Sequence, residues 1–175
     1  MRLIFISNLI IKVELGYSTL ESNNLSCDFL LNKLFGDKMD YKKYQTSVGN
    51  NYKHIQITPK YRYKMMRQEK LKIFCRVAIE ETCKRHKIEI EIINVQPDHV
   101  HMIVDCPRTF SDAKLMQILK GLSAYLLFRI CPSLRKRYPK GSFWSEGYFC
   151  CSIGANFDEV FEYVKNQDFH HQIFH

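Results

Sequence analysis

The hydrophobic pattern becomes regular from about Tyr44 and predicts seven elements in the rest of the chain. Apolar and polar residues alternate in the predicted strands, as expected when one face of a strand is buried. In the predicted helices apolar residues recur at steps of three and four, which places them on one face. The elements are, in order, strand 52–58, helix 64–87, strand 88–95, strand 99–106, helix 112–130, strand 143–153 and a helix after residue 156.

Short local signals mark where these elements begin and end. Pro59 stops the first strand, and residues 96–98 form a turn that makes a hairpin of the second and third strands. Ser111 is a suitable N-cap for the second helix. Asn156, with Glu159 three residues later, predicts a capping box in the wider sense at the start of the last helix.

The order β-α-β-β-α-β matches the ferredoxin-like, or split βαβ, arrangement. This α+β fold consists of an antiparallel sheet with both helices on one face, which leaves the other face uncovered. The helix after residue 156 is additional to that arrangement, so the pattern predicts that it has a separate role.

Residues 1–43 differ in character from the rest and form an N-terminal extension, so that the main domain is 44–175. They contain a short apolar run and then a polar tract. Either this is a genuine arm, or the start codon is assigned too early and the functional chain begins at Met39. The apolar run resembles a signal peptide only weakly, because polar residues break it and no small-residue cleavage site follows.

Composition narrows the class of protein. The chain has 175 residues, 46% of them hydrophobic, which suits one globular domain. Its net charge of +8 indicates a polyanionic partner, nucleic acid before a membrane surface, although solubility accounts for such a charge equally well. Seven cysteines without a C-x-x-C pair argue against a zinc ribbon and a secreted disulfide framework, and favour reduced, mostly buried thiols. No apolar run reaches the roughly 20 residues of a membrane span, so we expect a cytoplasmic protein without a membrane partner.

Two histidines flank one valine at the start of the strand 99–106. Because side chains alternate along a strand, His99 and His101 point to the same face, close enough to share a divalent ion. For such a short pattern taken alone, a polar strand end is the commoner explanation.

The last helix carries a second polar pair. Tyr163 and Gln167 are four residues apart and share one helical face, at the edge of its apolar stripe. A tyrosine in that position can bury its ring and leave its hydroxyl in a cleft. An ordinary boundary tyrosine is the simpler explanation for this pair alone.

Two loops combine cations with aromatic rings, a pattern typical of single-strand binding, in which cations follow phosphates and rings stack on unpaired bases. The alternative for each loop is a solvated basic surface. The second helix contributes one further cation to the predicted DNA-binding set, which is Lys60, Arg62, Lys64, Lys120, Arg135, Lys136 and Arg137.

Several blocks of the chain, in a fixed order, resemble one known family. The blocks are TPKYRYK at 58–64, VQPDHVHMIVDCP at 95–107, LKGLSAYLLF at 119–128, FWSEGYF at 143–149 and YVKNQ at 163–167. Together they resemble the TnpA-type single-tyrosine transposases of small bacterial and archaeal insertion sequences, the IS200-like transposases. These enzymes belong to the HUH class, named for histidine–hydrophobic–histidine. The resemblance covers roughly residues 44–167 and leaves out residues 1–38.

The resemblance implies a role for each matching residue. His99, His101 and Gln167 match the protein ligands of a divalent metal ion, Mg²⁺ or Mn²⁺, and Tyr163 matches the nucleophile. It further implies cleavage and rejoining of single-stranded DNA with hairpin ends, through a 5′-phosphotyrosine. The expected assembly is a homodimer in which the tyrosine helix is exchanged between subunits.

Three other functions are consistent with the same sequence. The chain can be an inactive copy of a transposase or a relative that its host has adopted. It can also be a non-catalytic nucleic-acid-binding module on the same fold, which reads RNA with exposed sheet aromatics.

Overall fold

The computed structural model describes residues 42–43 and 49–166. The chain divides into two compact units, Met1–Asn50 and Asn51–His175, and the strands and helices below belong to the second. The predicted N-terminal extension lies almost wholly outside the described residues, so its boundary stays a prediction.

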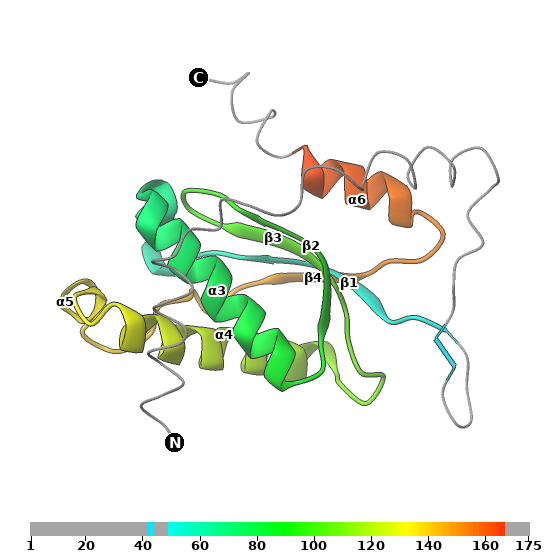
Figure 1. The fold of residues 1–175 in the computed structure, drawn as a ribbon, viewed down its shortest axis with the longest axis horizontal. Coiled ribbons are helices and arrows are strands. Elements are labelled where there is room, and N and C mark those ends of the chain that lie inside the picture. Colours follow the sequence, from blue (N-terminus) through cyan, green and yellow to red (C-terminus); the bar gives the residue numbers. More distant parts are fainter. Residues whose placement is uncertain (1–41, 44–48, 167–175) are drawn as a thin grey trace, which may run out of the picture. The chain divides into compact units, whose positions relative to one another are not determined.

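Four antiparallel strands form one sheet in the order β2-β3-β1-β4 (Figure 1). This order, with helices between the first and second and between the third and fourth strands in sequence, confirms the predicted α+β, ferredoxin-like fold. The strand bounds are β1 Tyr52–Ile57, β2 Glu89–Val95, β3 Val100–Asp105 and β4 Phe149–Ser152.

Helices α3 (Glu69–Arg85) and α4 (Asp112–Ile130) pack against each other and cover one face of the sheet (Figure 1). The strand registers assign to this face a set of almost fully buried side chains that form the core with the two helices: Ile55, Ile57, Val100, Met102 and Val104. The predicted N-cap of α4 is confirmed, because the Lys114 amide donates to Ser111 Oγ over 3.2 Å. Helix α6 (Phe157–Lys165) packs on β2 and β3 from the other side.

Two predicted bounds and one predicted cap are wrong. The first long helix begins at Glu69 and not at 64, because residues 60–67 form two 3₁₀ turns, η1 (Lys60–Arg62) and η2 (Met65–Arg67). The last strand covers only Phe149–Ser152 and not 143–153. In the segment before it, Trp144 forms an isolated β-bridge with Pro59. The capping box is also absent, since Asn156 makes no side-chain bond to the start of α6.

The six described cysteines are free, as expected, but only Cys75, Cys83 and Cys106 are buried. The prediction of mostly buried thiols therefore holds for half of them. No helix among the described residues is both long and apolar enough to cross a membrane.

Candidate active site

The sheet face opposite α3 and α4 carries polar and aromatic side chains in cross-strand rows. The registers align Asn94 of β2, His101 of β3, Gln56 of β1 and Phe149 of β4 in one row. Because neighbouring residues on a strand face opposite sides, these four share the face on which α6 lies.

The two histidines of the H-x-H motif come together on this face. Their ring centroids lie 4.9 Å apart, and each residue is only 4% exposed. His99 is the last residue before β3 and His101 is the second residue of that strand. Side chains alternate between the two faces along a strand, so the two rings point to the same face, as predicted.

The Nδ1 atom of each ring is engaged by a neighbouring side chain. Asp98 Oδ1 accepts from His99 Nδ1 over 2.7 Å, and Asp98 Oδ2 accepts from Arg62 over 3.2 Å. His101 Nδ1 lies 3.2 Å from Nε2 of His54, a residue of β1. A hydrogen bond at Nδ1 fixes the ring orientation and makes Nε2 the ligating nitrogen on each ring.

The charge states of these neighbours suit that arrangement. Burial by itself would raise the pKa of Asp98, but the hydrogen bond and charge of His99 and the Arg62 guanidinium outweigh it, so the pKa lies below its ordinary value. Burial lowers the pKa of His54, which favours a neutral imidazole that can accept from His101.

His54 is a site residue that the sequence prediction missed. The alternation in YKHIQIT already places it on the same strand face as Gln56. What the sequence does not show is that β1 pairs with β3, which brings His54 into contact with His101.

Tyr163, on α6, faces the same histidines. It is 48% exposed, and its ring centroid lies 6.1 Å from the rings of both His54 and His101. The helix is held on the sheet near its C-terminal end, where the Asn94 side chain donates to the Val164 carbonyl over 3.2 Å. The tyrosine and the histidine pair therefore meet within one chain.

The predicted metal ligands are two imidazoles and one amide. No cluster of three histidine, cysteine or acidic ligands occurs within the described ranges. Gln167, the predicted third ligand, lies outside them. Two nearly buried imidazoles oriented through Nδ1 are suitable donors for a divalent ion, and an amide oxygen would complete a set that suits Mg²⁺ or Mn²⁺.

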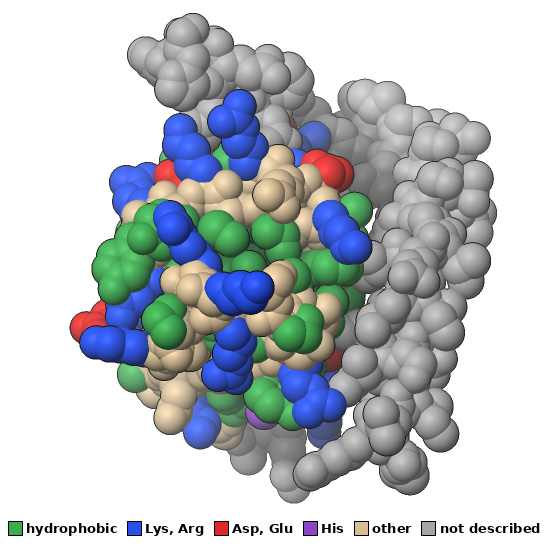
Figure 2. All heavy atoms as spheres, turned by 90° about the vertical axis from the view of Figure 1, so that its left-hand side faces the viewer, with side chains coloured by type: hydrophobic (Ala, Val, Ile, Leu, Met, Phe, Trp, Pro, Cys, Tyr) green, Lys and Arg blue, Asp and Glu red, His purple; other side chains and the backbone are tan. Residues whose placement is uncertain are grey.

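The structure brings the two predicted basic loops together at one end of the sheet. The second loop contains a short helix, α5 (Leu134–Arg137), and the Arg137 guanidinium lies 3.9 Å from the ring centroid of Tyr63 in the first loop. Tyr63 also lies 6.1 Å from Tyr138, ring to ring. Figure 2 views this end and shows Lys and Arg side chains spread over it.

Two of the predicted DNA-binding cations are arranged differently from the rest. Arg62 is bound to Asp98 and so contacts the partner of a predicted metal ligand. Lys120 projects from α4 to the segment before β4, where it donates to the Glu146 carbonyl.

The turn that carries Arg62 is strained. Tyr61 and Arg62 have φ angles of 64° and 49°, in the left-handed region that non-glycine residues rarely adopt. Such backbone costs about 1–3 kcal/mol per residue and concentrates at functional sites. The turn that follows it, η2, is held against the hairpin through the Met66 amide, which donates to the Pro97 carbonyl over 3.0 Å.

Comparison with known proteins places this arrangement in a family. The sequence model of the family described as "Transposase IS200 like" matches residues 47–167. The chain belongs to the IS200-like transposase family. The resemblance inferred from the five sequence blocks is thereby confirmed.

Named relatives of this transposase agree with that assignment. The transposase for insertion sequence element IS200 of Salmonella typhimurium strain LT2 is 29% identical over 114 residues, which are 65% of this chain and 74% of the relative. The ISDra2 transposase TnpA of Deinococcus radiodurans is 23% identical over 90 residues, 51% of this chain and 64% of that one.

Solved structures support the fold. A Deinococcus radiodurans protein described as a transposase aligns with a TM-score of 0.59 at 22% identity, covering 72% of this chain and 97% of the other. A REP-associated tyrosine transposase bound to a REP hairpin aligns with a TM-score of 0.51 at 16% identity, covering 74% of each chain. As a member of the family, this transposase is an enzyme that cleaves DNA and transfers strands.

Proposed function

We propose that this transposase cleaves and rejoins single-stranded DNA at the ends of an insertion sequence, with Tyr163 as the nucleophile. The observation that carries the proposal is the position of the Tyr163 ring, 6.1 Å from that of His101, on the face where the two histidines meet. The non-catalytic module considered from the sequence would not need these three side chains to converge.

In the cleavage step the Tyr163 oxygen attacks phosphorus, and the bond from phosphorus to the 3′ oxygen breaks. The phenol proton is lost and the leaving 3′ oxygen gains one, so the products are a 5′-phosphotyrosine and a free 3′-hydroxyl. The covalent bond retains the energy of the phosphodiester. A different 3′-hydroxyl can therefore reverse the step and join new strands without ATP.

His99, His101 and Gln167 would hold the divalent ion, Mg²⁺ or Mn²⁺. When bound, such an ion polarises the scissile phosphate and stabilises the negative charge that develops on it. The chain's own contribution is orientation: Asp98 and His54 hold the two imidazoles, and Asn94 holds α6 at the residue after Tyr163.

The DNA partner we propose is single-stranded and carries hairpins. A recessed site accepts an unpaired strand more easily than a duplex. The basic end of the sheet, with Lys60, Lys64 and the α5 cations interleaved with tyrosines, has the charge and the rings to hold such a strand.

A denaturing gel with labelled single-stranded DNA from the flanks of the protein's own gene, in Mg²⁺ or Mn²⁺, tests the proposal. The wild type should give a covalent adduct, whereas Tyr163→Phe should give none and keep its DNA affinity. Wild-type binding without an adduct would contradict the catalytic proposal and favour an inactive copy. Repeating the test with the chain begun at Met39 shows whether residues 1–38 affect the result.

We also propose a homodimer, and exchange of the tyrosine helix between subunits can be tested separately. Subunits carrying His101→Ala and subunits carrying Tyr163→Phe are mixed. An exchanged helix restores one complete site in each mixed dimer, and the adduct forms on the His101→Ala chain. If Tyr163 acts beside its own histidines, as the two lie within this chain, the mixture stays inactive.

A further inference from the structure

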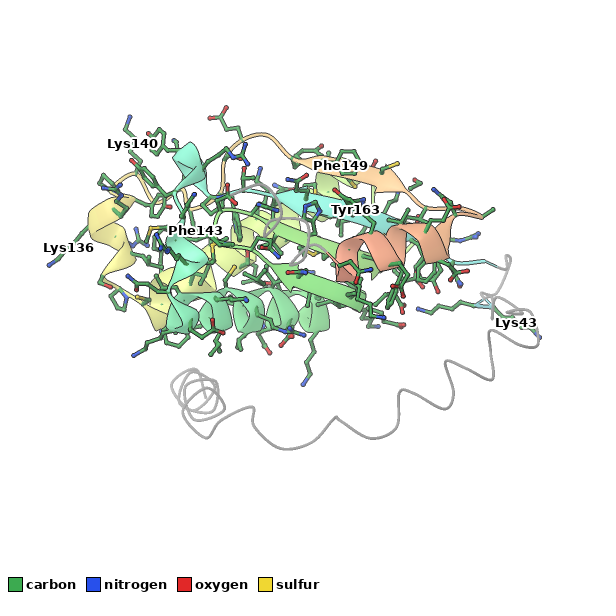
Figure 3. The ribbon with its side chains drawn as sticks, turned by 90° about the horizontal axis from the view of Figure 1, so that it is seen from above. Lys43, Lys136, Lys140, Phe143, Phe149 and Tyr163 are labelled. Atoms are coloured by element: carbon green, nitrogen blue, oxygen red, sulfur yellow. The ribbon has the colours of Figure 1, made fainter. Side chains whose placement is uncertain are left out.

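One exposed aromatic side chain lies beside the site and has no part in the reaction described above. Phe149 is 48% exposed, which is unusual for a large ring on a sheet. Phe149 belongs to the row that contains His101, and its ring centroid lies 5.3 Å from that of His54. Phe149 of β4 and Tyr163 of α6, both labelled in Figure 3, have the His54 ring as a common neighbour, at 5.3 and 6.1 Å between centroids.

Tyr148, the residue before Phe149, is also exposed but belongs to the other side of the strand. The Lys120 amino group of α4 lies 5.5 Å from the centroid of the Tyr148 ring and donates to the Glu146 carbonyl over 2.8 Å. Because neighbouring residues on a strand face opposite sides, Phe149 is the exposed ring that faces the histidines. An exposed ring on that face can stack on an unpaired base of a single strand.

We propose that Phe149 forms a subsite that stacks an unpaired base close to the scissile phosphate. This inference rests on the proposed function and adds a base-contacting surface to it. Because a duplex keeps its bases stacked on one another, only an unpaired strand can use the subsite.

The spacing suits a base near the point of cleavage. Phe149 is two strands away from His101, and strands lie about 4.8 Å apart, so their backbones are separated by roughly 10 Å. At about 3.4 Å per stacked nucleotide, that corresponds to roughly three nucleotides. The stacked base should therefore lie within a few positions of the scissile phosphate.

The test combines protein variants with abasic nucleotides. Single-stranded DNA from the gene's flanks is prepared with one abasic position at a time, on both sides of the cleavage point. Affinity is measured without divalent metal, so that no cleavage occurs. One abasic position should weaken wild-type binding by roughly 5- to 150-fold, the range for loss of one stacked base.

Phe149→Ala should bind intact DNA more weakly by the same factor. In this variant the same abasic position should then cause no further loss of affinity. Phe149→Trp should retain both the affinity and the sensitivity. The matched control is Tyr125→Ala, which removes an exposed ring from α4, the helix on the opposite side of the sheet, and should change neither.

The two proposals fail in distinguishable ways. If Phe149→Ala and the abasic position weaken binding independently, or if Phe149→Ala changes nothing, the stacking subsite is refuted even though the Tyr163 adduct still forms. If the wild type forms no adduct but the abasic effect is present and disappears in Phe149→Ala, the subsite stands and the catalytic proposal fails.

Discussion

Replacing Asp98 by asparagine tests how the predicted metal ligand His99 is held. The carboxylate accepts from His99 Nδ1 over 2.7 Å and is only 20% exposed. Asparagine keeps an acceptor oxygen but loses the charge. Hydrogen bonds to charged groups contribute about 1.5–3 kcal/mol and neutral ones about 0.5–1.5 kcal/mol. The difference, about 1–1.5 kcal/mol, predicts roughly tenfold weaker metal binding, at the lower end of the range for such partners.

Arg62 should act on the same site through Asp98. Its side chain is 70% exposed, so its ion pair with Asp98 has an expected contribution of about 0.2–1 kcal/mol. Arg62→Gln should therefore weaken metal binding by roughly 1.5- to 5-fold, and adding it to Asp98→Asn should cost little more. The matched control is Lys136→Gln, which removes the same charge at a distance from Tyr163 (Figure 3).

The assay is calorimetric titration of each variant with Mn²⁺ in the absence of DNA. The reasoning is refuted if Asp98→Asn binds Mn²⁺ as tightly as the wild type. It is also refuted if the effects of Arg62→Gln and Asp98→Asn simply add, because Arg62 would then act by another route.

Three further results are expected. Asn94→Ala removes the donor to the Val164 carbonyl, so adduct formation should slow while DNA affinity in a binding assay stays the same. If the variant and the wild type form the adduct at equal rates, this bond does not position α6. Trp144→Phe removes the bond from the buried indole to Ser123 Oγ, 2.9 Å long, and should lower the free energy of unfolding in urea by about 1–3 kcal/mol; no change would contradict that role. The pKa of Asp98 is lower in the folded state than its unfolded value, which is near 3.8. Its stabilising effect is therefore present above the unfolded value and is lost as the pH falls through the lower folded value. Asp98→Asn should flatten that part of the curve of unfolding free energy against pH, and an unchanged curve would argue against the ion pair.

The hydrophobic pattern was sufficient for the fold but not for all its bounds. Alternation and helical period predict the element order, and that order fits one known sheet topology. The start of α3 was misplaced because its apolar spacing continues backwards through Met66, which is buried although it lies in a 3₁₀ turn. The last strand was predicted too long because the aromatic residues Phe143 and Trp144 resemble strand residues in the sequence. In the structure they are buried core residues that precede β4.

The sequence predicted those residues of the candidate site that belong to recognisable motifs. His99, His101 and Tyr163 could be named because the motifs contain them, and the structure brings them together. His54 and the Asp98–Arg62 pair could not be assigned, since their roles depend on contacts between segments distant in sequence or across a turn. From the sequence, Asp98 is only a turn residue and Arg62 only a cation.

The most direct test of the central claim is to identify the bond that forms on cleavage. Single-stranded DNA labelled at either its 5′ or its 3′ end is incubated with the protein and Mn²⁺, and the adduct is digested and mapped by mass spectrometry. The label should remain with the protein only when it is at the 3′ end, and the modified peptide should contain Tyr163 joined to a 5′-phosphate. A modification on another residue, or retention of the 5′-end label, would contradict the account.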